Sequence, residues 1–129
     1  MEEIDSLFML QDSHLLVFTY DRNYEWNQAD FHNIERIFAQ NAEIFLAAMK
    51  DLCENIFEHS PDVSQIDSTL RFVNGEAVVL FIDDGDLYNP FSSEELINSP
   101  NIKKLKSIGC ELDYTNVLGL NKSYFHFKE

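Results

Sequence analysis

The stretch STLRFVNGEAVVLFI, residues 68–82, decides the fold. Asn74-Gly75 within it is the strongest short-range signal for a two-residue hairpin turn, because both residue types tolerate positive φ. Residues of high β propensity flank this turn, and Leu70 and Phe72 alternate on the first arm. The second arm, 77–82, is apolar throughout, which is typical of a central strand with both faces partly covered. We therefore expect an antiparallel hairpin in the middle of a sheet.

Two helices are expected before this hairpin, at residues 30–40 and 42–59. Apolar residues recur in both segments with the 3.6-residue period of a helix. Ser60-Pro61 ends the second helix, because the residue before a proline is displaced from the helical region. Residues 6–20 are predicted to form two short strands or one broken strand, with the turn at 11–13. The apolar face of the longer helix comprises Met49, Leu52 and Ile56.

A short helix and a second hairpin are expected after an irregular segment at 86–100. Ser99 followed by Pro100 is typical of an N-cap and a first helical residue, and Gly109 of a C-terminal stop, so this helix is placed at about 100–108. The last hairpin pairs 110–116 with 122–128 through a turn at 118–121.

Strands that arrive as hairpins, with helices grouped between them, predict an α+β fold. The expected architecture is a two-layer sandwich, with helices on one face of a mostly antiparallel, mixed sheet. At 129 residues the chain has the length of a single domain, 1–129.

The composition restricts the partners and the compartment. Nine Lys and Arg against 23 Asp and Glu give a net charge of −14, which argues against binding to nucleic acid or to an anionic membrane. The two cysteines lack the spacing of a metal site or a disulfide framework. The N-terminus is acidic where a signal peptide is basic, and no apolar run approaches the ~18 residues of a membrane span. We therefore expect a cytoplasmic protein with a protein partner.

Three polar residues recur at intervals of four along the helix expected at 42–59. Asp51, Asn55 and His59 fall on one stripe, opposite the apolar face. An amide oxygen can complete a Mg²⁺ shell of water and phosphate oxygens, and a carboxylate one turn earlier can orient or deprotonate a nucleophile. The alternative is the solvated polar face of an amphipathic helix.

An acidic turn, Asp83-Asp84-Gly85, follows the apolar arm of the hairpin. A carboxylate at the end of a buried strand suits a hydrogen bond from an exocyclic amine, and a glycine lets a ligand approach the backbone closely. Asp-Gly turns are also common as plain strand endings, so this alternative stays open.

In this order, the two patterns resemble the N box and first G box of the GHKL ATPase superfamily, which includes gyrase, histidine kinases and the mismatch-repair ATPase. The small anti-sigma-factor serine kinases form the branch that is most similar. Three segments resemble that branch, IDDGDLYNPF (82–91), ELDYTNVLGLN (111–121) and KSYFHF (122–127), so that the resemblance covers about residues 40–127.

The resemblance implies a histidine-kinase-like ATPase domain of Bergerat type, with ATP and Mg²⁺ between the long helix and a mixed sheet. Asn55 would then bind Mg²⁺, and Asp51 would be the catalytic, polarising base. Asp83 would contact the adenine, and Gly85 would let the backbone pass close to the purine.

The chain departs from that family at three places. The N-box acid is usually Glu, and Asp51 is shorter by one methylene; a misplacement of about 1 Å can cost on the order of 10²-fold in rate. Leu87 stands where the second glycine of the G box is expected. The lid segment, 97–107, has no glycine, and Asn101 stands at one lid position. These changes affect the chemical step more than the adenine contact.

Three lysines, Lys103, Lys104 and Lys106, lie at the start of the helix expected at 100–108. Backbone N–H groups at a helix N-terminus, together with nearby lysines, can bind phosphates without a glycine-rich lid. Solvated lysines, or a docking point for an acidic partner, are the alternatives.

Three functions are compatible with these residues. The first is a degenerate GHKL-type regulatory module that binds a small protein domain, in anti-sigma-type signalling, with weak or no catalysis. The second is an active Mg-ATP-dependent serine/threonine protein kinase of the anti-sigma-factor type. The third is an α+β interaction domain whose match to the motifs is a coincidence. A second copy of the chain is a further candidate partner.

Overall fold

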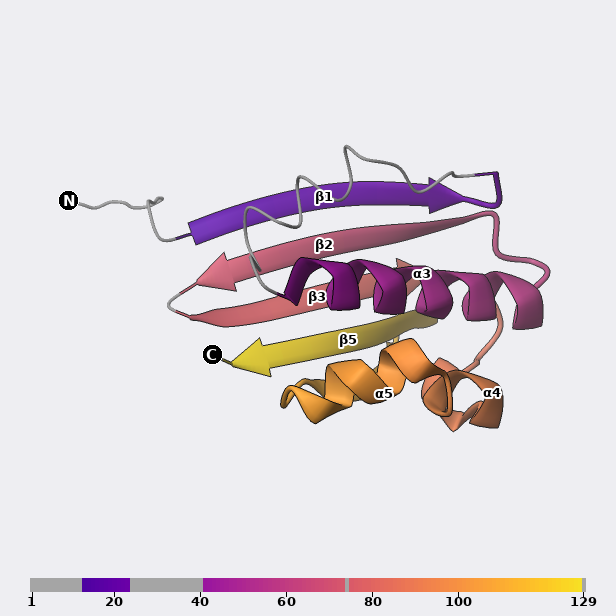
Figure 1. The fold of residues 1–129 in the computed structure, drawn as a ribbon. Helices are drawn as coiled ribbons and strands as arrows, with labels where there is room; N and C mark the ends of the chain where they lie inside the picture. The colour runs from indigo at the N-terminus through magenta and orange to yellow at the C-terminus, as the bar shows by residue number, and fades with distance from the viewer. Residues whose placement is uncertain (1–12, 24–40, 74, 129) are drawn as a thin grey trace.

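Five strands form one antiparallel sheet, with helices packed on one of its faces (Figure 1). The computed structural model describes residues 13–23, 41–73 and 75–128. The strand order is β1-β2-β3-β5-β4. The strands are β1 (Ser13–Asp21), β2 (Gln65–Val73), β3 (Glu76–Asp83), β4 (Glu111–Val117) and β5 (Leu120–Lys128). The helices are α3 (Ala42–His59), α4 (Glu94–Ile97) and α5 (Pro100–Ser107), with a single 3₁₀ turn, η2 (Pro90–Ser92).

The α+β sandwich expected from the sequence is confirmed. Every strand pair in the described ranges is antiparallel, so these residues contain no parallel pair of the kind that a mixed sheet includes. The helix expected at 30–40, and the part of the first strand prediction at 6–12, lie outside the described residues. Ser13 belongs to β1 rather than to a turn, and β1 runs unbroken to Asp21.

The central hairpin forms as predicted. β2 and β3 are in register from Asp67↔Ile82 to Val73↔Glu76, which leaves a two-residue turn, and Gly75 in that turn has a φ of 81°. The side chains of β3 alternate between a buried face and a half-buried face. The buried face, which packs on the helices, comprises Ala77, Val79, Phe81 and Asp83.

Helix α3 has the predicted bounds and the predicted phase. Met49, Leu52 and Ile56 are at most 1% exposed and belong to the hydrophobic core, together with Phe45 and Phe125. Its polar stripe faces α4 and α5, which lie beside it in Figure 1. None of the helices in the described ranges is long and apolar enough to cross a bilayer.

The segment at 86–100, expected to be irregular, contains η2 and α4. Both are held by side-chain caps: Asn89 accepts from the N–H of Phe91, and Ser93 accepts from that of Leu96. One capped turn is too short to show a helical period, which is why the pattern was missed. α5 forms as predicted, with Ser99 as its N-cap and Gly109 after its end at a φ of 94°.

The last hairpin also forms, but its turn is shorter than predicted. Leu118 and Gly119 make the turn, both with positive φ, and β5 already begins at Leu120. Asn121, expected in the turn, therefore lies in a strand and pairs with Asp83 of β3 and with Asn116 of β4. This register brings it under the loop that follows β3.

Candidate functional site

The polar stripe of α3 lines a small pocket against the segment between β3 and β4. The pocket has a volume of about 210 Å³, below the roughly 300–1,000 Å³ of typical small-molecule sites. Four carboxylates contribute to its wall, and no basic side chain among the described residues does. The lining residues are Asp51, Glu54, Asn55, Glu58, Glu95, Leu96 and Ser99.

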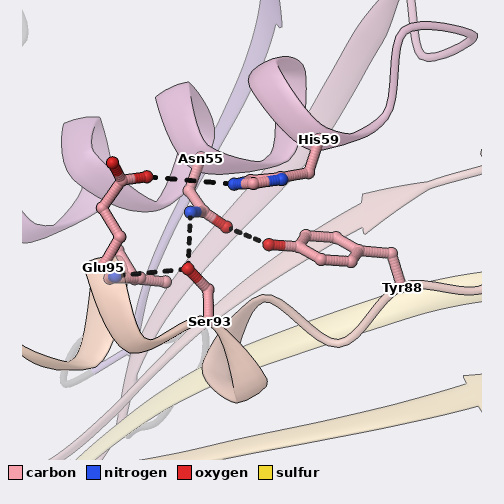
Figure 2. A network of polar contacts seen from close by, with 6 residues as sticks. Asn55, His59, Tyr88, Ser93 and Glu95 are labelled. Atoms are coloured by element: carbon pink, nitrogen blue, oxygen red, sulfur yellow. Dashed lines mark hydrogen bonds and ion pairs between the residues drawn. The ribbon is translucent and has the colours of Figure 1, made fainter.

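Asn55 is 5% exposed, and partners from the following segment engage both ends of its amide (Figure 2). The Tyr88 hydroxyl donates to Asn55 Oδ1 at 2.7 Å, and Asn55 Nδ2 donates to Ser93 Oγ at 3.2 Å. Burial raises the pKa of Tyr88, so its hydroxyl stays protonated near neutral pH and remains a donor. Ser93 also caps α4, so this contact fixes α4 against α3.

Asp51, one helical turn earlier, also forms hydrogen bonds with residues of the segment between β3 and β4. Its Oδ2 accepts from Ser99 Oγ at 3.2 Å and from Asn101 Nδ2 at 3.0 Å. Ser99 also accepts from the N–H of Ile102 as the N-cap of α5. Asn101, where a lid glycine was expected, thus supplies an amide that ties α5 to the carboxylate.

His59, the third residue of the stripe, lies at the end of α3 beside α4. Its ring stacks on Tyr88, with centroids 5.4 Å apart and an interplanar angle of 27°. Its Nε2 is 3.8 Å from Glu95 Oε1, and the donor atoms of Glu58, His59 and Glu95 lie within 4.8 Å of one another. Two carboxylates and one imidazole are ligands that suit a divalent metal. All three side chains are exposed. The ion pair between His59 and Glu95 therefore contributes little to the stability of the fold.

Asp83 is 7% exposed and lies outside the lining of this pocket. Its Oδ1 accepts from Asn121 Nδ2 at 2.9 Å and from the N–H of Gly85 at 3.0 Å. A chain of hydrogen bonds connects it to Asn55, because Asn121 Oδ1 accepts from the N–H of Tyr88 at 3.4 Å. Asp83 and Asn55 thus belong to one network without lining one pocket.

Gly85 is buried, and its missing side chain has a reason within the fold. A Cβ at this position would clash with Cγ2 of Val63, a core residue. Close packing of the chain on itself therefore accounts for this glycine, where the resemblance implied a close approach to a purine.

The three lysines lie along α5. Lys103 ends its first turn, and Lys104 and Lys106 lie in its last turn, where positive charge stabilises the carbonyl end of the helix dipole. Lys103, Lys104 and Lys106 are all exposed, and none of them lines the pocket beside Asn55.

Sequence reasoning missed three residues that hold this site together: Tyr88, Ser93 and Asn121. For Asn121 a signal existed. Extending the alternation of Phe125 and Phe127 back along β5 puts position 121 on the buried face, where a polar side chain needs partners. Tyr88 and Ser93 act through tertiary contacts that no local pattern indicates.

Comparison of the chain with protein-family models and with curated proteins gives no match. Any functional proposal therefore rests on the residues of this chain and on the geometry of the site.

Proposed function

We propose that this chain is a regulatory module that binds a protein partner and has weak or no catalytic activity. In this proposal it is a degenerate relative of the GHKL superfamily, close to the anti-sigma-factor kinases and acting in similar signalling. The order of Asp51, Asn55, Asp83 and Gly85 along the chain supports the relationship. The contacts of the same residues support the loss of turnover.

The observation that carries the proposal is that the chain's own side chains occupy the polar groups of the N-box stripe. Asn55 Oδ1, the atom that would bind Mg²⁺, already accepts from the Tyr88 hydroxyl. Asp51, which would orient a nucleophile, is held by Ser99 and Asn101. In a pocket of only about 210 Å³, a nucleotide that bound either group would have to compete with these contacts.

The donor set of the pocket is also a poor match to Mg-ATP. Triphosphate is strongly anionic, and the wall of the pocket carries Asp51, Glu54, Glu58 and Glu95. Like charges at such short range repel, and the lysines that could offset them lie elsewhere on α5. We therefore assign no step of phosphate transfer to these residues.

The proposal includes a cytoplasmic location and a protein as the partner. Both cysteines, Cys53 and Cys110, are free and buried, which is compatible with a reducing compartment. The charge of −14 favours a partner with a basic surface over nucleic acid or an anionic membrane.

Thermal unfolding with and without millimolar Mg-ATP tests the loss of nucleotide binding. A ligand at 100 times its Kd would stabilise the fold by about 2.7 kcal/mol, which is several degrees for a domain of this size. We expect no shift for the wild type. A shift that is lost in Asn55→Ala and kept in Asp84→Ala, an exposed carboxylate outside the network, would overturn the loss of nucleotide binding.

Transfer of labelled phosphate from ATP to co-purified partner proteins tests turnover separately. We expect none above background for the wild type. Transfer by the wild type that Asp51→Ala abolishes would establish the serine/threonine kinase instead.

A further inference from the structure

The outer edge of β4 is open in the part of the chain that the structure describes. β4 is the last strand in the sheet order, and within the described residues it pairs only with β5. The N–H of Tyr114 donates to Oδ1 of the preceding Asp113 at 2.8 Å, which places this N–H on the side away from β5. By the alternation of an antiparallel strand, Leu112 and Asn116 present their backbone groups on the same side. Such an edge is a template for another strand, whose carbonyl would replace the Asp113 carboxylate as the acceptor of the Tyr114 N–H.

A groove of about 600 Å³, within the usual range for ligand sites, lies at the beginning of this edge, beside the first residues of β4. Leu112 faces the helices, whereas Glu111 and Asp113 point to the opposite face of the sheet, and all three line the groove. The groove therefore wraps over the outer edge of the strand. Its full lining is Phe91, Ile97, Lys106, Cys110, Glu111, Leu112 and Asp113.

The two sides of the groove differ in chemistry. On the helix side, Phe91, Ile97 and Leu112 are half-buried and apolar, and Lys106 adds an exposed ammonium from α5. On the open face of the sheet, Glu111 and Asp113 are exposed carboxylates. Because side chains of an added strand alternate between these sides, its apolar residues would meet the first and its basic residues the second.

We propose that β4 binds an extended segment of a partner protein, in which apolar and basic residues alternate, as an additional strand of the sheet. The proposal deepens the proposed function and rests on it, since it names the surface through which the module binds its partner. Backbone hydrogen bonds would give affinity, and the groove would select the side chains.

Charge disfavours a second copy as the occupant. Two β4 strands paired with each other would bring Glu111 and Asp113 of both copies together, and like charges across strands destabilise a pair. Each copy also carries a net charge of −14. A basic segment would instead be attracted both by these carboxylates and by the net negative charge of the chain.

Fluorescence anisotropy with the full chain and a labelled peptide tests the proposal. The probe is a peptide as long as β4, seven residues, in which Val and Lys alternate. One control peptide replaces Lys by Glu, and another keeps every side chain but carries N-methyl groups on the backbone nitrogens of alternate residues. We expect binding by the probe and a loss of about tenfold or more with either control, because N-methylation removes several hydrogen bonds.

Variants of the chain locate the site. Asp113→Lys should weaken the Lys peptide about fivefold, since it removes an attraction and adds a repulsion. Asp84→Lys changes the net charge equally at an exposed site outside the groove and should leave binding unchanged. Ile97→Ser should weaken binding without a loss of folding, because Ile97 is half-buried and lies outside the core cluster. Thermal unfolding of each variant checks that it is folded.

Two results would overturn the inference. Binding that is insensitive to N-methylation and equally reduced by both lysine variants would reveal general charge attraction. A concentration-dependent dimer in sedimentation that Asp113→Lys alters would make a second copy the occupant. Absence of peptide binding would refute this surface alone. Phosphate transfer that Asp51→Ala abolishes would refute the proposed function, whatever the peptide does.

Discussion

The buried amide of Asn121 holds together the end of β3, the following loop and the last hairpin. It is 2% exposed, and its Nδ2 donates to Asp83 Oδ1 at 2.9 Å, to Gly85 O at 3.2 Å and to Asp86 O at 2.9 Å. Its Oδ1 accepts from Asn116 Nδ2 at 3.0 Å and from the Tyr114 hydroxyl. We predict that Asn121→Ala is among the most destabilising single changes outside the apolar core.

The magnitude follows from the hydrogen bonds that the change would remove at two buried acceptors. The Gly85 carbonyl would lose its partner, which costs about 1–3 kcal/mol. The Asp83 carboxylate would keep the N–H of Gly85 but lose a hydrogen bond to a charged group, which contributes about 1.5–3 kcal/mol. Asp86 is exposed, so its carbonyl can bind water at little cost. Two buried acceptors give an expected loss of about 2–5 kcal/mol in the free energy of unfolding. Asn116→Ala, which removes one bond from an exposed residue, should cost below about 1 kcal/mol and is the matched control.

Urea unfolding followed by circular dichroism measures both losses, with an unchanged dependence on urea as evidence that each variant keeps the fold. Asn121→Asp adds a sharper comparison. It would place a second carboxylate against that of Asp83, so its loss relative to wild type should be larger at neutral pH than in mild acid, where one carboxylate takes up a proton. If Asn121→Ala costs no more than Asn116→Ala, the assigned role of the amide is wrong.

Three further predictions concern packing and the thiols. Gly85→Ala should lower the free energy of unfolding by about 1–3 kcal/mol, because its Cβ would clash with Val63. The double variant Gly85→Ala, Val63→Ala should lose less than the sum of the two single changes. Additive losses in urea unfolding would contradict the contact. Leu52→Ala should cost about 2–5 kcal/mol, since the side chain is fully buried, and a loss below about 0.5 kcal/mol would mean that the helix phase was misread. Burial raises the pKa of Cys53, and that of Cys110 to about 12, so neither should react with a thiol reagent near neutral pH until urea unfolds the chain.

Most of the fold could be predicted from the sequence, because the local signals in the sequence agree with the tertiary structure. The turn at Asn74-Gly75, the apolar face of α3 and the Ser99-Pro100 start of α5 each act within one element. Elements of a single turn, such as α4, give no period to detect, and their caps were recognisable only once the chain was folded.

The candidate site was only half predictable for the same reason. Spacing along α3 placed Asp51 and Asn55 on one stripe, and they do line one pocket. Their partners lie 33 to 50 positions further along the chain, and no sequence pattern over such a distance showed that they would meet. The sequence showed that glycines of the resembled motifs are missing. It did not show the contacts made by the residues that stand in their place, such as that of Asn101 with Asp51.

The segment from η2 to α5 contributes to both surfaces that the proposals use. Ser93, Ser99 and Asn101 hold it against the stripe of α3, whereas Phe91 and Ile97 line the groove beside β4. A movement that opened the pocket to a ligand would therefore also displace one wall of the groove. The pocket beside α3 and the groove beside β4 are therefore two consequences of the same packing.

This connection gives a last prediction. Asn101→Gly places a glycine where the resemblance expects one and removes the 3.0 Å bond to Asp51, and Asn101 is not a lining residue of the groove. It should weaken binding of the alternating peptide by several fold, because the segment that carries Ile97 is then less firmly held. Lys103→Gly, at an exposed position of the same helix, is the control for the backbone effect of glycine. If the two variants bind the peptide with equal affinity in anisotropy titrations, the groove does not depend on the contact between Asn101 and Asp51.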